Sequence, residues 1–111
     1  MVGGEAVRRG DVFLLDPHPT RGEEIRKRRP CLVVSPDELN QHLSTFIVAP
    51  LTRGGHPYPF RISCRFARKK GFVVLDQIRT VDRDRLLQRL GRMSPATTVK
   101  ALTVLQQMFH A

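Results

Sequence analysis

The chain has 111 residues, enough for one domain with a buried core but too few for two. It carries 19 Lys and Arg residues against 10 Asp and Glu residues, a formal net charge of +9. That excess, mostly arginine, favours a polyanionic partner: a nucleic acid, an anionic membrane surface or an acidic protein. Nucleic acid is the partner we favour, because guanidinium groups bind phosphate oxygens in pairs.

The apolar stretches and the cysteines indicate where the protein is located and whether it binds a metal. The N-terminal MVGGEAVRRGD lacks an apolar core of signal-peptide length, and stretches such as FIVAPLT are too short to span a membrane. We therefore expect a cytoplasmic protein with no membrane contact. Cys31 and Cys64 lie in strand-like segments and have no ligand-like spacing. We therefore expect reduced, partly buried thiols, no metal and no cofactor.

Short β-rich segments dominate the first three quarters of the chain. They cover residues 11–16, 31–35, 44–51, 58–66 and 71–79. The fourth alternates polar and apolar residues, as a half-exposed strand does, and the fifth follows a Lys-Lys-Gly turn. Strands at such close spacing predict a small, closed antiparallel barrel.

Two Ser-Pro steps predict helix starts. Within residues 35–42 we expect one helical turn, capped by Ser35 with Pro36 in the first position. A longer helix is expected from Ser94 and Pro95, and it should lie against the barrel. Its apolar stripe, at helical spacing, consists of Ala101, Leu102, Leu105, Met108 and Phe109. Residues 1–7 are expected to form a tail and residues 8–111 a single domain.

Charge is most concentrated in RGEEIRKRRP, residues 21–30. Gly22 frees the backbone to bring amide groups close to an anion. Arg29 directly precedes Pro30 and a strand, so its backbone should be extended and its side chain aimed from a fixed platform. The other basic residues have looser anchors, and for each alone a solvated loop position is the ordinary interpretation. They are Arg21, Arg26, Lys27 and Arg28.

Three further groups of polar residues stand at strand ends or in loops, where binding residues gather. Thr52, next to Arg53 in APLTRGG, either bonds to its local backbone or faces a ligand. In DQIRTVD, residues 76–82, an apolar strand turns polar. Asp76, Gln77 and Arg79 suit the reading of base edges, whereas Asp82 suits a turn cap. Among the histidines, His42 and His110 suit the surface, and His18 and His56 flank the charged loops.

Taken in order and spacing, these segments closely resemble the MazF/PemK family of toxin endoribonucleases, from about residue 8 to residue 109. The segments are RRGDVFLLD, PTRGEEIRKRRPCLVVSPDELN, IVAPLT, VLDQIRTVDRDRL and LGRMSP. The resemblance implies a mainly β fold with a C-terminal helix, a small SH3-like (CcdB/PemK-type) antiparallel barrel that works as a homodimer. It also implies metal-independent cleavage of single-stranded RNA to 2′,3′-cyclic phosphate and 5′-hydroxyl ends. The implied partner is an antitoxin whose acidic C-terminal tail occupies the RNA groove.

The resemblance also assigns catalysis to three residues. The arginine of the family's R-P step is Arg29, the threonine of its P-L-T stretch is Thr52, and the glutamate of its G-x-E block is Glu24. Residues of the charged loops and of the D-Q-I-R-T block are then expected to bind RNA: Arg21, Gly22, Arg26, Lys27, Arg53, Asp76, Gln77 and Arg79. A version of the mechanism based on a histidine before the glutamate does not transfer, because Glu23 stands there.

In this mechanism Arg29 neutralises charge on the phosphate, Thr52 donates a hydrogen bond to it, and Glu24 is a weak base. Positioning and electrostatics should then supply most of the acceleration. Two other functions stay open. One is a non-catalytic SH3-like module that binds RNA or an acidic peptide, and the other is a CcdB-like toxin that poisons gyrase by protein contact.

Overall fold

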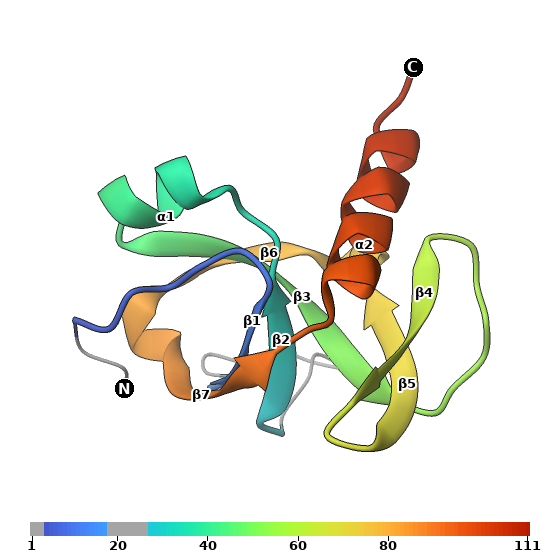
Figure 1. Ribbon diagram of the computed structural model, residues 1–111, viewed down its shortest axis with the longest axis horizontal. Helices are drawn as coiled ribbons and strands as arrows, with labels where there is room; N and C mark the ends of the chain where they lie inside the picture. The colour runs from blue at the N-terminus through green and yellow to red at the C-terminus, as the bar shows by residue number, and fades with distance from the viewer. Residues whose placement is uncertain (1–3, 18–26) are drawn as a thin grey trace.

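A seven-stranded antiparallel sheet and a C-terminal helix make up the computed structural model, which describes residues 4–17 and 27–111 (Figure 1). The strands are β1 (Asp11–Leu15), β2 (Arg29–Val33), β3 (Thr45–Arg53), β4 (Arg61–Phe66), β5 (Lys69–Val74), β6 (Arg79–Asp82) and β7 (Leu86–Arg92). The helices are α1 (Asp37–His42) and α2 (Pro95–Met108), with 3-10 turns at Leu75–Gln77 and Arg83–Arg85. No helix within the described ranges has the length and apolar character that crossing a membrane requires.

The strands follow the order β4-β5-β3-β2-β1-β7, and β6 pairs with β3 beside this path. The long strand β3 joins the two halves of the sheet: residues 45–48 pair with β6, and residues 51–53 pair with β5. Such a mainly β fold with a C-terminal helix confirms the expected class. Because β3 pairs with strands of both halves of the sheet, its residues lie at the centre of the molecule.

The expected closure of the barrel is wrong. Within the described residues, no ladder joins the edge strands β4 and β7, which meet through side chains. A Cβ atom placed on Gly91 of β7 would lie 3.4 Å from the ring of Phe66 on β4. The barrel therefore has an open seam, filled by side chains rather than by backbone hydrogen bonds.

The central strands are buried on both faces. Val12 and its neighbour Phe13 belong to two different apolar clusters, because successive side chains of a strand point to opposite faces. Helix α2 covers the first cluster with Ala101, which is fully buried. The end of α2 projects away from the sheet (Figure 1), and Phe109 is 71% exposed there, so the predicted apolar stripe packs only in part.

Several predicted boundaries shift. The fifth predicted segment is divided, because the 3-10 turn Leu75–Gln77 separates β5 from β6. The turn of the β4–β5 hairpin consists of Ala67 and Arg68, with φ of 51° and 64°, and not of the Lys-Lys-Gly stretch, which lies inside β5. Strand β7 had no counterpart in the prediction, because its burial shows no regular alternation.

The two helix starts differ. The hydroxyl of Ser94 accepts a hydrogen bond from the Thr97 amide at 3.2 Å, which confirms the predicted cap of α2. Ser35 does not cap α1, whose capping position is taken by Pro36. The Ser35 hydroxyl instead donates to Asn40 Oδ1 at 2.6 Å and accepts from the amide of Ile47 at 3.1 Å, so it joins α1 to β3.

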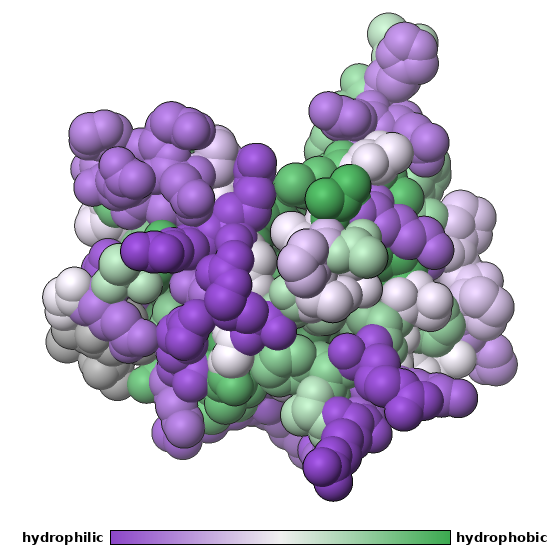
Figure 2. Space-filling view, viewed as in Figure 1, coloured by the Kyte–Doolittle hydropathy of each residue, from purple (hydrophilic) through white to green (hydrophobic). Residues whose placement is uncertain are grey.

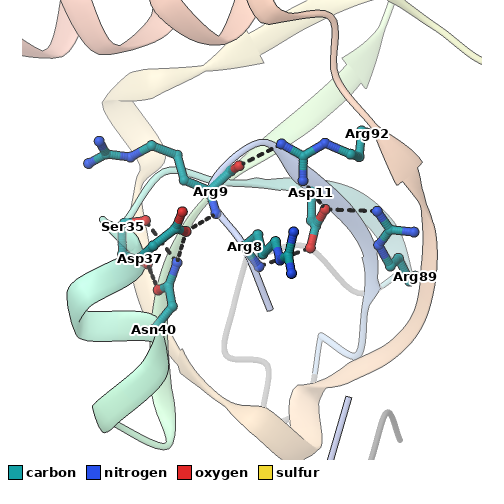
Figure 3. Close-up of polar contacts among 8 residues, drawn as sticks. All are labelled: Arg8, Arg9, Asp11, Ser35, Asp37, Asn40, Arg89 and Arg92. Carbon is teal, nitrogen blue, oxygen red and sulfur yellow. Dashed lines mark hydrogen bonds and ion pairs between the residues drawn. The ribbon is translucent and has the colours of Figure 1, made fainter. Parts of the chain in front are cut away.

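A buried carboxylate fastens β1 to β7 (Figure 3). Asp11 is 1% exposed and accepts hydrogen bonds from Arg92 at 2.7 Å, Arg89 at 3.0 Å and the Arg8 amide at 2.9 Å. The pairing of β1 with β7 is irregular at two places, so these bonds supplement a weakened ladder. Val7, in the expected tail, is also buried, while the boundary of the domain at residue 8 stays a prediction.

Candidate functional site

A groove of about 880 Å³ lies between the start of β2, the end of β3 and the β4–β5 hairpin. Its floor is apolar, with Leu14, Leu51, Phe66, Phe72 and Leu90 among the lining residues. Figure 2 shows apolar side chains exposed between β7 and the hairpin, and hydrophilic ones at the hairpin tip. The open seam of the barrel thus forms one side of the groove.

The charged side chains of the groove are all basic in the part of the chain that the structure describes. They are Lys27, Arg28, Arg29, Arg53, Arg61 and Lys69. No described carboxylate is among the lining residues. Because like charges around a concave surface add their potentials, these side chains favour an anion in the groove. Six of the 19 basic residues of the chain therefore surround one cavity.

Arg29 lies where the sequence predicted. It is the first residue of β2, pairs with Leu15 of β1, and is half-buried, whereas Lys27 and Arg28 are exposed. Within residues 4–17 and 27–111 no ion pair engages its guanidinium. A cation held by a strand and not neutralised by these residues is suited to binding a phosphate in the groove.

Thr52 lines the same groove and pairs with Phe72 of β5. Its hydroxyl accepts a hydrogen bond from the Phe72 amide at 3.3 Å and donates to the Gly54 carbonyl at 3.3 Å. The two interpretations of this threonine thus hold together: it bonds locally and it faces the cavity. The bond to Gly54 is long, so a phosphate oxygen can replace it as acceptor.

Gly71 sets how closely β5 approaches Thr52. A Cβ atom at position 71 would lie only 1.6 Å from the Thr52 carbonyl oxygen, closer than any side chain can come. Only glycine therefore allows this pairing, and the position of Thr52 depends on it.

The residues of the D-Q block are not part of the groove lining. Asp76 and Gln77 occupy the 3-10 turn and Arg79 begins β6; all three are exposed, and none lines the cavity. Both carboxylate oxygens of Asp76 accept hydrogen bonds from Arg61, at 2.9 Å and 3.0 Å. These hydrogen bonds lower the pKa of Asp76. Base reading by Asp76 would require this pair to open, while a role for Gln77 and Arg79 stays a prediction.

Several predictions fall outside the described residues. They concern Arg21, Gly22, Glu24, Arg26 and His18. Lys27 and Arg53 line the groove as expected of RNA-binding residues, although their role stays a prediction. Asp82 precedes the 3-10 turn Arg83–Arg85, but its side chain makes no capping bond.

The groove also contains residues that the sequence did not single out. Arg61 and Lys69 come from the β4–β5 hairpin, and His56 from the segment before β4. The available signal was the presence of five basic residues among residues 61–70, and its meaning depended on where the hairpin folds. Cys64 is also in the lining, and partial burial raises the pKa of its thiol. Burial raises the pKa of Cys31 to about 12, so neither thiol is activated as a nucleophile.

A family model described as a PemK-like, MazF-like toxin of type II toxin–antitoxin systems matches residues 8–109. The chain belongs to this toxin family. Endoribonuclease MazF of Staphylococcus epidermidis is 32% identical over 100 residues, which cover 85% of this chain and 83% of that protein. The resemblance of the sequence motifs to the MazF/PemK family is thereby confirmed.

Solved structures of toxins share the fold. An endoribonuclease from Mycobacterial species, in complex with its cognate antitoxin, is 28% identical with a TM-score of 0.77, covering 92% of this chain and 93% of that one. MazF from Deinococcus radiodurans is 25% identical with a TM-score of 0.80, covering 94% and 96%. The chain therefore has the same overall fold as these two toxins.

Proposed function

We propose that this MazF/PemK-family protein is an endoribonuclease toxin that cleaves single-stranded RNA and is neutralised by a cognate antitoxin. The observation that carries the proposal is that Arg29 and Thr52 line one groove whose described charged residues are all basic. The name of the 32% identical relative, an endoribonuclease, supports the activity. The mycobacterial complex of an endoribonuclease with its antitoxin supports the partner.

The chemistry that this groove suits is attack of a ribose 2′-hydroxyl on the neighbouring phosphorus. A bond forms between the 2′-oxygen and phosphorus, the bond from phosphorus to the 5′-oxygen breaks, and the products are a 2′,3′-cyclic phosphate and a 5′-hydroxyl. The 2′-hydroxyl loses a proton and the leaving oxygen gains one. The 2′-oxygen, the phosphorus and the leaving 5′-oxygen must be held in line while negative charge develops on the phosphate.

Arg29 is suited to neutralise that charge. Its guanidinium can donate two parallel hydrogen bonds to non-bridging phosphate oxygens, and β2 limits its movement. It is a poor proton donor, because an arginine pKa above about 12 makes loss of the proton costly at neutral pH. Its contribution is therefore electrostatic.

Thr52 is suited to orient the phosphate. The Phe72 amide holds the hydroxyl oxygen, so the hydroxyl proton can turn from the Gly54 carbonyl to a phosphate oxygen. Glu24 remains the proposed base. A free glutamate has a pKa of about 4.3, so it is ionised at neutral pH but weakly basic. Proton transfer then adds less to the rate than positioning and charge.

The partners follow from the same charge. An acidic C-terminal antitoxin tail would compete with RNA for the groove, since both present negative charge to one surface. We also propose a homodimer that acts on RNA in the cytoplasm, as the family resemblance implies.

The test is incubation of the purified protein with labelled single-stranded RNA in EDTA, followed by mapping of both new ends. We expect cleavage with cyclic phosphate ends, and a loss of about 10²–10³-fold in single-turnover rate for Arg29→Ala. Arg28→Ala, an exposed neighbour in the same groove, should weaken binding slightly and leave the rate at saturating RNA unchanged. Binding without cleavage would indicate a non-catalytic module, and equal rates for both variants would contradict the role of Arg29.

A further inference from the structure

Tyr58 is the centre of a side-chain assembly at the edge of the groove. It lies between β3 and β4 and is 55% exposed. The Arg61 guanidinium carbon lies 5.0 Å from the centre of its ring, a cation–π contact. The His56 ring meets Tyr58 edge-on, with 6.4 Å between ring centres. Arg61 and His56 both line the groove that contains Arg29 and Thr52.

Asp76 fixes the orientation of Arg61. Nε and Nη2 of Arg61 donate to the two carboxylate oxygens at 2.9 Å and 3.0 Å, the side-by-side geometry that holds both groups in one plane. The pair links β4 to the 3-10 turn after β5. Arg61 thus keeps its Nη1 donors and a face of its guanidinium plane for a ligand, while its charge lies over the aromatic ring.

Stability does not account for this assembly. The side chains of Arg61 and Asp76 are 25% and 42% exposed, and ion pairs so accessible to water contribute little to folding. Tyr58 is exposed over more than half its surface, so core packing does not account for it either. A tyrosine ring and a fixed guanidinium plane, in contact with each other and open to solvent, are the kinds of surface on which proteins stack unpaired bases.

We propose that Tyr58 and Arg61 form a subsite that stacks a nucleobase flanking the scissile phosphate, with Asp76 as the positioning residue for Arg61. That the bound polymer is RNA rests on the proposed function. The inference assigns to Asp76 a role other than direct base reading, since its oxygens already bind Arg61. It also explains why a single-stranded substrate is suited to the groove: only an unpaired base can lie on such a surface.

The experiment uses short unstructured RNAs in which 2-aminopurine replaces one base at a time and a 2′-deoxy sugar blocks cleavage. Stacking on Tyr58 quenches the fluorescence of this base. With the full-length wild-type protein we expect quenching at one flanking position. Tyr58→Leu should abolish the quenching and weaken binding about tenfold, whereas Tyr58→Phe should keep both. Asp76→Asn should reduce the quenching in a protein that has Arg61. In the Arg61→Ala variant, the same substitution should cause no further reduction.

Two matched controls separate stacking from general effects. Phe109→Leu removes an exposed aromatic ring just after α2, and Arg65→Ala removes an exposed cation of β4 that does not line the groove. Both should leave the quenching unchanged. In multiple-turnover cleavage, Tyr58→Leu should raise KM and leave kcat unchanged, which a loss of folded protein would not do.

The inference is overturned if Tyr58→Leu quenches and binds like Phe109→Leu. It is also overturned if the variant loses affinity for an acidic polyglutamate peptide while its RNA binding is intact. A wild-type protein that quenches but does not cleave an unblocked RNA would refute the proposed nuclease and support the stacking subsite. The failures of the two proposals are therefore distinguishable.

Discussion

Gly71→Ala is expected to damage both the fold and the groove. The new Cβ atom would stand 1.6 Å from the Thr52 carbonyl oxygen, and ordinary contact begins near 3.4 Å, so β5 and β3 must separate by most of the difference. Overpacking of this kind costs about 3 kcal/mol of unfolding free energy, a large part of the roughly 5–15 kcal/mol of a typical domain. The strands pair over only residues 51–53 of β3, so the shift acts directly on Thr52.

The same displacement should lower catalysis in the molecules that remain folded. A shift of about 1 Å in a positioning group can cost about 10²-fold in rate. Urea unfolding followed by circular dichroism measures the first effect, and single-turnover RNA cleavage at low temperature measures the second. Gly4→Ala is the control, because nothing lies within 4 Å of the new atom there. If Gly71→Ala unfolds and cleaves like Gly4→Ala, the close approach of β5 to β3 is not what positions Thr52.

Three further substitutions test other parts of the argument. Glu24→Gln should lower the single-turnover rate by only about tenfold, less than the usual general-base effect of about 10²–10⁴-fold; complete loss with RNA affinity intact would show that proton transfer dominates. Asp11→Asn should lower the unfolding free energy by about 2 kcal/mol in urea titrations, because two arginines of β7 lose a charged acceptor; an unchanged midpoint would contradict this. Ser94→Ala should cost about 1 kcal/mol by the same titration, whereas Ser94→Asp, which keeps a capping oxygen, should cost little.

Local chemistry made some of these features predictable. The cap of α2 depends on a hydroxyl and an amide three residues apart, so the Ser-Pro step was sufficient to predict it. Arg29 is restricted by the proline that follows it, and its place at the start of β2 follows from that restriction. The family resemblance supplied the class of the fold, because its motifs cover nearly the whole chain.

The predictions that were wrong concern contacts between residues that are distant in sequence. Serine is a residue type that often caps helices, but the Ser35 hydroxyl accepts a hydrogen bond from the Ile47 amide. Only the folded sheet brings these two groups together. Closure of the barrel depends on whether the edge strands β4 and β7 pair through backbone hydrogen bonds, and no local pattern encodes that. The pair of Arg61 and Asp76 spans 15 residues and forms only because the chain turns after β5. Base reading by Asp76 stays a prediction, and it would require this pair to open.

The open seam gives the two walls of the groove unequal freedom. The wall with Arg29 and Thr52 is held by backbone hydrogen bonds on both sides. Strand β2 pairs with β1 and β3, and β3 also pairs with β5 and β6. The opposite wall, the β4–β5 hairpin, is tied by backbone on one side only in the described chain, and against β7 it rests on contacts such as that of Phe66 with Gly91. Parting those contacts breaks no ladder. Within the described residues, the β4 edge of the hairpin can therefore move relative to β7 without loss of backbone pairing, whereas the ladders of β2 and β3 hold Arg29 and Thr52 in place.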